Sequence, residues 1–254
     1  MSHGIDLALI GGTGLYRLPG FEQVERHAVD TPYGHPSDAL VVGRVGKRRV
    51  AFLARHGESH TIPPHRVNYR ANLWALHRLG ARRVIGVNAV GGIRADMRPR
   101  VLAVPDQIID YTHGRLTSYG DVAGAEVRHI DFSEPYTASL RRDLLAAGAR
   151  AAVAVVDGGC YGATQGPRLE TRAEIARLRR DGCDLVGMTG MPEAALAREL
   201  GVDYACLALV ANWAAGCGDQ VEISMPEILA NLEAATAAVP KILAALLTPA
   251  RAGA

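Results

Sequence analysis

Lysine is almost absent from this chain: Lys47 and Lys241 are the only lysines among 28 basic residues, and the others are arginines. Arginine suits planar anions, although a codon bias would produce the same composition. The basic residues are spread along the chain, and the formal net charge is only +2. The sequence therefore predicts no nucleic-acid partner and no binding to an anionic membrane surface.

The sequence also lacks paired cysteine motifs, a signal segment and a long apolar run. Its cysteines show no CxxC spacing, which predicts free thiols in a reducing compartment; they are Cys160, Cys183, Cys206 and Cys217. No basic-then-apolar segment opens the chain and no apolar run approaches about 18 residues, so we expect neither secretion nor membrane spanning. A cytoplasmic location is the resulting expectation.

Strand-length apolar runs alternate with helical segments along the chain. Its 254 residues suffice for one sizeable α/β domain with a full core, so we expect a single domain over residues 1–254. Antiparallel strands are predicted within 21–48, other strands over 50–53, 83–87 and 151–165, and helices over 68–79, 136–149 and 172–181. A last helix should run towards Leu247 with a break or kink at Pro240.

Two of the predicted strands end in residues that can meet an anion. The first strand, over 6–10, runs into the glycine-rich turn at 11–14, where backbone N–H groups and Thr13 could contact a phosphate; a plain tight turn remains an alternative. Dinucleotide binding is disfavoured because the third glycine of that fingerprint is missing. The strand over 50–53 delivers Arg55 and His56 to its carboxyl end, where α/β sheets bind ligands.

Residues 185–212 read as a β-α-β unit, the arrangement in which two parallel strands flank a helix. Pro192 and Glu193 open the helix, Gly201 ends it, and the apolar run that follows predicts a strand buried on both faces. Met188, Thr189 and Asn212 then lie at strand ends.

Several other features keep two interpretations. The turn predicted at 88–92 either faces an anion or packs tightly against a neighbouring strand. Three histidines, at 56, 60 and 65, lack the spacing and partners of a zinc site, so we expect no metal. Thr171 with Glu174, and Ser224 with Glu227, form two predicted capping boxes. Glu170 lies outside these boxes and is either solvated or a ligand acceptor.

Taken in order, six motifs resemble the purine nucleoside phosphorylase and methylthioadenosine phosphorylase family, in its trimeric branch. They are the GGTG turn at 11–14, ARHG at 54–57, VNYRAN at 67–72, NAVGG at 88–92, GPR at 166–168, and GMT at 187–189 leading to PE at 192–193. The resemblance spans nearly the whole chain. It implies a mixed, largely parallel twisted sheet flanked by helices.

The resemblance also implies a role for each candidate site residue. Phosphate, a co-substrate, would be held by Thr13, Arg55, His56, Thr189 and the backbone N–H groups around Ala89 and Val90. The nucleoside would meet Met188 at the ribose, Leu169, Glu170, Asn212, Trp213 and Ala214 at the base, and Met225 at the 5′ end. His129 would reach a neighbouring subunit's site in a homotrimer or a dimer of trimers.

Two departures within the family point to the substrate. Glu170 and Asn212 resemble the pair of 6-oxopurine enzymes: the carboxylate can accept N1–H, while the amide donates to O6 and accepts from N7–H. Met225 resembles the methylthio branch, in which an apolar residue covers the 5′ group. Leu169 departs from both branches, since a phenylalanine usually packs against the base.

We therefore expect phosphorolysis of S-methyl-5′-thioinosine to hypoxanthine and 5-methylthioribose 1-phosphate. No cofactor or metal is expected. The expected catalytic residues are Asn212, Glu170 and His56. Methylthioadenosine phosphorylase and inosine or guanosine phosphorylase are alternatives within the family. A nucleoside hydrolase and a nucleoside-binding protein without turnover are alternatives from other classes.

Overall fold

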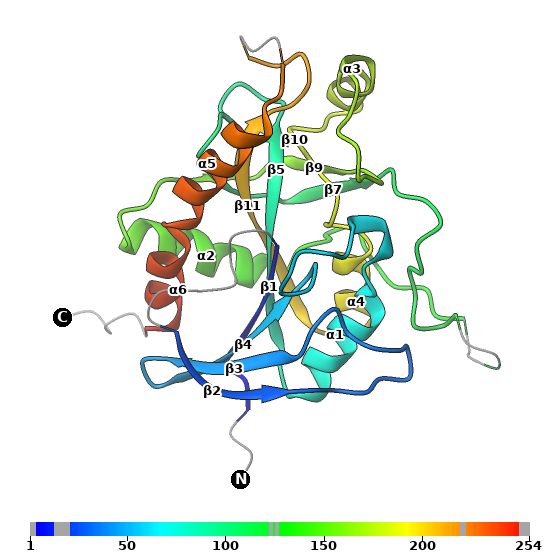
Figure 1. The fold of residues 1–254 in the computed structure, drawn as a ribbon, viewed down its shortest axis with the longest axis vertical. Helices are drawn as coiled ribbons and strands as arrows, with labels where there is room; N and C mark the ends of the chain where they lie inside the picture. The colour runs from blue at the N-terminus through cyan, green and yellow to red at the C-terminus, as the bar shows by residue number, and fades with distance from the viewer. Residues whose placement is uncertain (1–3, 13–20, 122–123, 125–126, 219–221, 249–254) are drawn as a thin grey trace.

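The computed structural model describes residues 4–12, 21–121, 124, 127–218 and 222–248. Its strands form one 11-stranded sheet at the centre of the molecule (Figure 1). They are β1 (Leu7–Gly11), β2 (Glu22–His27), β3 (Leu40–Val45), β4 (Arg48–Ala54), β5 (Arg83–Gly92), β6 (Leu102–Val104), β7 (Gln107–Asp110), β8 (Val155–Asp157), β9 (Cys160–Ala163), β10 (Leu185–Gly187) and β11 (Asp203–Trp213).

The main path through the sheet is β2-β3-β4-β1-β5-β10-β9-β7, with β11 also pairing with β5. Six of the ten pairings among the described strands run parallel and four run antiparallel. The antiparallel β2 and β3 correspond to the strands predicted within 21–48. The predicted mixed, largely parallel sheet flanked by helices is confirmed.

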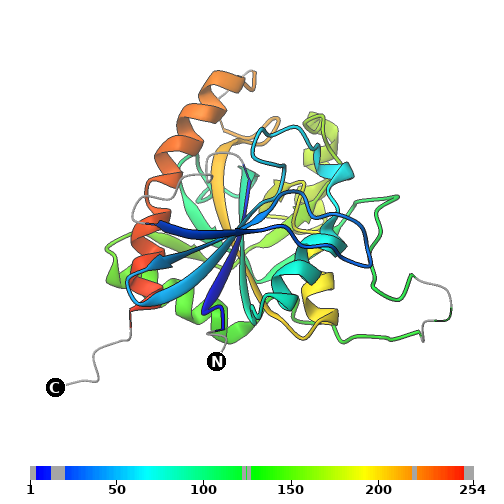
Figure 2. The ribbon, with the colours of Figure 1, turned by 60° about the horizontal axis from the view of Figure 1, so that its bottom comes forward.

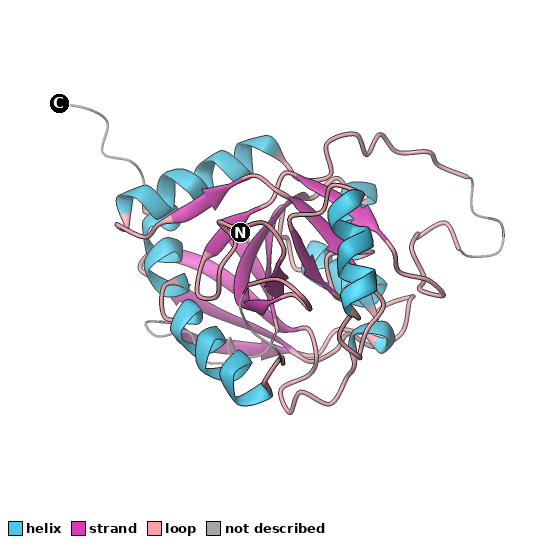
Figure 3. Cartoon of the chain, turned by 90° about the horizontal axis from the view of Figure 1, so that it is seen from above, coloured by secondary structure: helices cyan, strands magenta, loops and turns pink. Residues whose placement is uncertain are grey.

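Helices cover both faces of the sheet (Figures 1 and 3). They are α1 (Tyr69–Arg78), α2 (Ala138–Arg150), α3 (Arg172–Arg180), α4 (Glu193–Glu199), α5 (Met225–Thr236) and α6 (Val239–Leu247), with a short 3-10 helix at Pro64–Arg66. Strand β11 shows how the core divides. Tyr204, Cys206, Ala208 and Val210 belong to the cluster packed with α1 and α4, whereas the alternate residues belong to the cluster packed with α2, α5 and α6.

Three strand predictions were wrong in detail. The segment at 88–92 is not a turn, because β5 continues through it and pairs with both β10 and β11. The strand predicted over 151–165 is two short strands, β8 and β9, separated by Gly158 and Gly159, both at positive φ. The unit at 185–212 is not a parallel β-α-β: β10 runs antiparallel to β5, and β5 lies between it and β11.

Most of the predicted helix ends were confirmed, and one predicted capping box was wrong. Thr171 and Glu174 form the expected capping box, and Gly201 follows α4 at a φ of 65°. Ser224 is the N-cap of α5 but makes no side-chain capping hydrogen bond, so that second capping box was wrong. The break near Pro240 is confirmed, since α5 ends at Thr236 and α6 starts at Val239.

The stretch Met225–Leu247 corrects the expectation about apolar runs. By length and composition it could cross a membrane. The stretch is two helices that lie against the sheet (Figure 1). Side chains along both helices, including Leu232, Val239 and Leu243, are buried in the core cluster.

Candidate active site

Two strands run towards each other along the same edge of β5. The parallel strand β1 pairs with β5 as far as Val87, and the antiparallel strand β10 pairs from Gly91. Residues between these points have neither strand beside them on that edge. Ala89 is exposed there, although the rest of β5 beyond its first residue is buried. The chain continues from β1 into Gly12 and from β10 into Met188 and Thr189, so both continuations reach this opening.

A cavity of about 580 Å³ lies at this opening. Its volume is in the range typical of small-molecule sites. Its lining includes the expected residues Arg55, His56, Ala89, Val90, Leu169, Glu170, Met188, Thr189, Asn212, Ala214 and Met225, together with Gly12, His60, Ile223 and Ile228. The structure thus brings together most residues that the sequence singled out.

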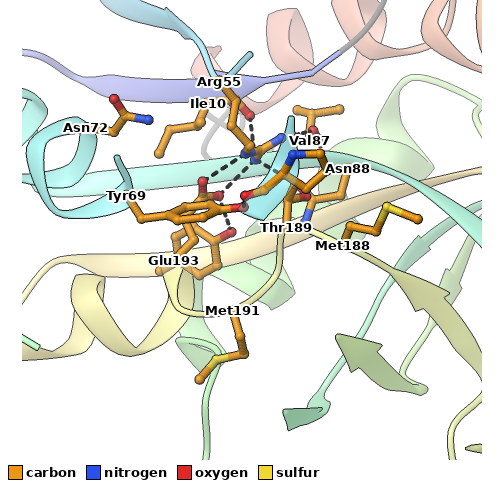
Figure 4. A network of polar contacts seen from close by, with 12 residues as sticks. Ile10, Arg55, Tyr69, Asn72, Val87, Asn88, Met188, Thr189, Met191 and Glu193 are labelled. Atoms are coloured by element: carbon orange, nitrogen blue, oxygen red, sulfur yellow. Dashed lines mark hydrogen bonds and ion pairs between the residues drawn. The ribbon is translucent and has the colours of Figure 1, made fainter. Parts of the chain in front are cut away.

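Arg55 occupies the floor of this region and is buried, with 1% of its side chain exposed. Its Nε and Nη2 atoms donate to the two carboxylate oxygens of Glu193, at 2.9 and 2.8 Å (Figure 4). Nη2 also donates to Asn88 Oδ1 at 2.7 Å, and Nη1 donates to the Val87 carbonyl at 3.1 Å. Burial by itself would lower the pKa of Arg55, but the Glu193 carboxylate outweighs burial and raises it.

This network changes what Arg55 can offer to an external anion. Nε and Nη2 are engaged by protein acceptors, namely Glu193, Asn88 and the Ile10 carbonyl. Of the five N–H bonds of the guanidinium, only the second N–H of Nη1 has no acceptor among the described residues. Nη1 lies near Gly12, where an added Cβ would be 3.6 Å away. Arg55 therefore presents one N–H edge and a charge that is already paired with Glu193.

His56 offers a hydrogen-bond acceptor to a ligand, whereas Arg55 offers a donor. Its Nδ1 lies 2.7 Å from the Ile62 carbonyl oxygen, and a carbonyl can only accept, so Nδ1 carries the proton. Burial, followed by the charge of Arg55, lowers the pKa of His56 to about 4. The ring is therefore neutral near pH 7 and carries a lone pair on Nε2. This atom lies near Gly12, since a Cβ added to Gly12 would be 3.9 Å from it.

The turn after β10 is held in place by Arg115. Its guanidinium Nη1 donates to the carbonyls of Met188 and Met191, at 2.9 and 2.6 Å. Nη2 donates to the carbonyls of Thr164 and Gln165 at 3.2 and 2.9 Å. One side chain thus connects the turn that carries Met188 and Thr189 with the end of β9.

Glu170 and Asn212 also line the cavity. The Thr164 hydroxyl donates to Glu170 Oε1 at 2.6 Å, which leaves the second carboxylate oxygen for a ligand. The Asn212 amide nitrogen donates to the Trp213 carbonyl at 2.7 Å. Because an amide nitrogen has two hydrogens, Asn212 keeps one donor and its oxygen as acceptor.

Three expected site residues are not in the cavity as the structure describes it. Trp213 follows Asn212 on β11, faces away, and lines a separate cavity with Cys217. His129 is exposed on the segment between β7 and α2, which extends away from the body of the molecule (Figure 2). Thr13 lies outside the described residues.

The sequence reasoning missed the functional importance of Glu193, Asn88 and Arg115. Glu193 was read only as a helix-opening carboxylate, but it is fully buried against Arg55. Asn88 Nδ2 is buried without a hydrogen-bond partner among the described residues. No local signal marks Arg115, because its acceptors are 46–76 residues away in the sequence.

Comparison with known proteins gives a consistent result. The family model described as "Phosphorylase superfamily" matches residues 6–248. A probable S-methyl-5′-thioinosine phosphorylase of Xanthomonas campestris pv. campestris is 61% identical over 245 residues, covering 96% of this chain and 98% of that protein. A 6-oxopurine nucleoside phosphorylase of Pyrococcus furiosus is 42% identical over 248 residues, covering 95% of this chain and 91% of that protein.

Solved structures give the same fold. Methylthioadenosine phosphorylase from Schistosoma mansoni in complex with adenine superposes with a TM-score of 0.90 at 31% identity, covering 95% of this chain and 90% of that chain. A methylthioadenosine phosphorylase from an antarctic soil metagenomic library gives a TM-score of 0.89 at 35% identity, covering 96% and 85%.

Proposed function

The chain belongs to the phosphorylase superfamily, and we propose that it catalyses phosphorolysis of S-methyl-5′-thioinosine to hypoxanthine and 5-methylthio-α-D-ribose 1-phosphate. It is a pentosyltransferase of the nucleoside phosphorylase type, which acts in purine salvage. Four relatives at 53–61% identity carry the name probable S-methyl-5′-thioinosine phosphorylase. The observation that carries the proposal is one cavity that combines Glu170 and Asn212 with an apolar rim at Met225.

Glu170 and Asn212 support an oxo base through donor and acceptor matching. Hypoxanthine offers N1–H to the free Glu170 oxygen, O6 to the remaining Asn212 N–H, and N7–H to the Asn212 oxygen. Adenine would set a bare N1 against the carboxylate and N6–H₂ against the amide N–H. A buried polar group without its partner costs about 1–3 kcal/mol, so two mismatches give a large preference.

The 5′ end of the nucleoside is assigned to the apolar side of the cavity. Met225, Ile223 and Ile228 line it there. A methylthio group gains about 0.8 kcal/mol for each buried carbon, whereas a hydroxyl in the same place would lose a water partner. Met225 is 58% exposed, so it has surface to bury on binding.

Phosphate is assigned to the opening above Ala89. The Arg55 Nη1–H edge, Thr189 and backbone N–H groups of β5 are the donors, with Thr13 as a further proposed ligand. His56 accepts, so the phosphate that fits is one that carries a P–OH group, as monohydrogen phosphate does. Its negative oxygens lie under C1′ and stabilise the positive charge that develops on the sugar.

In the reaction a phosphate oxygen bonds to C1′ while the C1′–N9 bond breaks, and the electrons of that bond pass to the purine. Overall, the proton of the phosphate P–OH group ends on the released hypoxanthine, and the sugar phosphate leaves as a dianion. Hydrogen bonds from Asn212 and to Glu170 stabilise the leaving base as its negative charge grows. The residues named here account for these steps without a cofactor or metal.

The assembly and location of the enzyme are also proposals. We propose a cytoplasmic homotrimer, with pairing of trimers as an option, in which His129 reaches the site of a neighbouring subunit. The exposed position of His129, on a segment that extends from the body, supports this role (Figure 2).

A coupled assay with inosine, adenosine and their 5′-methylthio forms, each with and without phosphate, tests the proposal. We expect the highest kcat/KM for methylthioinosine, and base release only with phosphate. A preference for methylthioadenosine, which the names of the solved structures would favour, would overturn the base assignment. Release without phosphate would indicate a hydrolase, and binding without release in either condition would indicate a binding protein.

A further inference from the structure

The strand that carries Asn212 contains a bulge directly before this residue. Val210 pairs with Val90, but the next pair is Asn212 with Gly91, so Ala211 is an extra residue in β11. Bulges next to active sites change the direction in which a side chain points. The origin of the bulge therefore bears on how Asn212 reaches the cavity.

Alternation along β11 shows what the bulge does. Val210 belongs to the core cluster packed with α1 and α4, and Ala211 to the cluster packed with α2, α5 and α6. Strict alternation would return Asn212 to the side of Val210. Instead, Asn212 pairs with Gly91, the residue after Val90 on β5, so Asn212 lies on the side opposite Val210. Ala211 and Asn212 both line the cavity, together with Met225 of α5. The extra residue places Asn212 on the side of α5.

The bulge is held by a buried side chain outside the cavity. Asn231 of α5 is 4% exposed, and its Nδ2 donates to the Ala211 carbonyl at 3.0 Å. Arg100 Nε donates to the Asn231 oxygen at 2.8 Å, which fixes the orientation of the amide. The backbone N–H of Arg100 donates to the Val210 carbonyl at 2.7 Å. The two carbonyls at the bulge thus have dedicated donors.

The backbone of Arg100 supports this view. Its φ of 73° lies in the left-handed region, which costs energy for a residue with a side chain. Such a conformation persists only where surrounding contacts enforce it. Here those contacts are the hydrogen bonds to Val210 and Asn231.

We propose that Asn231, oriented by Arg100, is a positioning residue for purine selection: it fixes the Ala211 bulge and thereby aims the Asn212 amide at the base. This inference rests on the proposed function, since Asn212 must contact the purine. It adds a residue that touches no substrate. It also links the two ends of the nucleoside, because the helix that holds the bulge begins with Met225 at the 5′ end.

The test compares the ratio of kcat/KM for methylthioinosine to that for methylthioadenosine in four proteins. Asn231→Leu removes the donor to Ala211 at nearly constant size and should lower the ratio about tenfold, because the loosened bulge no longer holds the amide against O6 and N7. Arg100→Met keeps the backbone N–H to Val210 and should lower the ratio by a smaller factor, about threefold. Arg100 is exposed, so this variant should fold even where Asn231→Leu does not.

Leu232→Ala is the matched control, since it weakens the packing of α5 next to Asn231 but removes none of the hydrogen bonds that hold the bulge. It should lower the melting temperature and leave the ratio unchanged. An unchanged ratio in Arg100→Met, or an equal fall in Leu232→Ala, would overturn the inference. Phosphate-dependent release of hypoxanthine by the unmodified enzyme is measured first, so that a failure of the proposed function is recognised separately.

Discussion

Replacing Glu193 by glutamine tests the charge balance beneath the phosphate position. The carboxylate is fully buried and makes three hydrogen bonds, two from Arg55 and one from the Tyr204 hydroxyl at 2.7 Å. Glutamine keeps the shape, but it removes the negative charge and sets an amide N–H against an N–H of Arg55. The guanidinium is then left buried with only neutral partners.

The expected loss of stability is large. Removing one partner of a buried ion pair costs about 3–5 kcal/mol, because the other charge stays out of water. For a protein of this size, each kcal/mol lowers the melting temperature by about 2–4 °C. Glu193→Gln should therefore melt roughly 10 °C lower than the unmodified enzyme in a buffer without phosphate.

Phosphate should restore part of this stability, because a bound dianion supplies the missing counter-charge near Arg55. The assay is thermal unfolding at increasing phosphate concentration, with sodium chloride at equal ionic strength as the reference. We expect the gap between Glu193→Gln and the unmodified enzyme to narrow as phosphate rises. A gap that stays constant would show that no anion site adjoins Arg55, and would refute the reasoning.

A second bidentate arginine–carboxylate pair provides the matched control. Arg168 donates to both oxygens of Glu174, at 2.8 and 2.7 Å, but the two side chains are 68% and 41% exposed. Exposed pairs contribute about 0–1 kcal/mol. Glu174→Gln should therefore shift the melting temperature by only a few degrees, independently of phosphate. If both substitutions lowered the melting temperature equally, burial would not determine the free energy that is lost when the ion pair is broken.

Three further predictions concern acid and the two ends of the nucleoside. Folding lowers the pKa of His56 to about 4, from an unfolded value of about 6.5. His56 therefore adds on the order of 3 kcal/mol to the free energy of unfolding above pH 6.5, and this contribution is lost as pH falls towards 4. The free energy of unfolding of His56→Gln should depend less on pH across this window than that of the unmodified enzyme. Asn212→Asp with Glu170→Ser should shift kcat/KM about tenfold or more towards 6-aminopurine nucleosides, and an unchanged ratio would contradict the base assignment. Met225→His should raise activity on inosine relative to methylthioinosine; equal responses of both substrates would place Met225 away from the 5′ end.

Local rules in the sequence were sufficient for much of the fold. The capping box of Thr171 and Glu174, the stop at Gly201 and the break before Pro240 depend on residues a few positions apart. Propensity and capping act over that range, so the sequence displays them directly. The apolar runs that became β1, β4 and β11 were equally clear, because buried strands in such sheets are continuously apolar.

Partners far apart in the sequence could not be predicted in the same way. Arg55 and Glu193 are 138 residues apart, and neither is unusual in its local context. The bulge at Ala211 is a property of pairing between β11 and β5, not of the apolar run itself. In both cases the contact depends on the register of the finished sheet, which periodicity does not specify.

The predicted direction of β10 was wrong, and its observed direction explains how the opening beside β5 forms. If β10 ran parallel to β5, the chain after Gly187 would continue towards the carboxyl end of β5, next to Asn212. The middle of β5 would then face only the chain that follows β1. In the antiparallel strand, Leu185 pairs with Gly92 and Val186 with Gly91, so the chain that follows returns along β5. It meets the end of β1, whose last residue pairs with Val87. Two strand ends therefore converge on the same three residues of β5, and a small opening there has donors on both sides, as a phosphate with several oxygens requires.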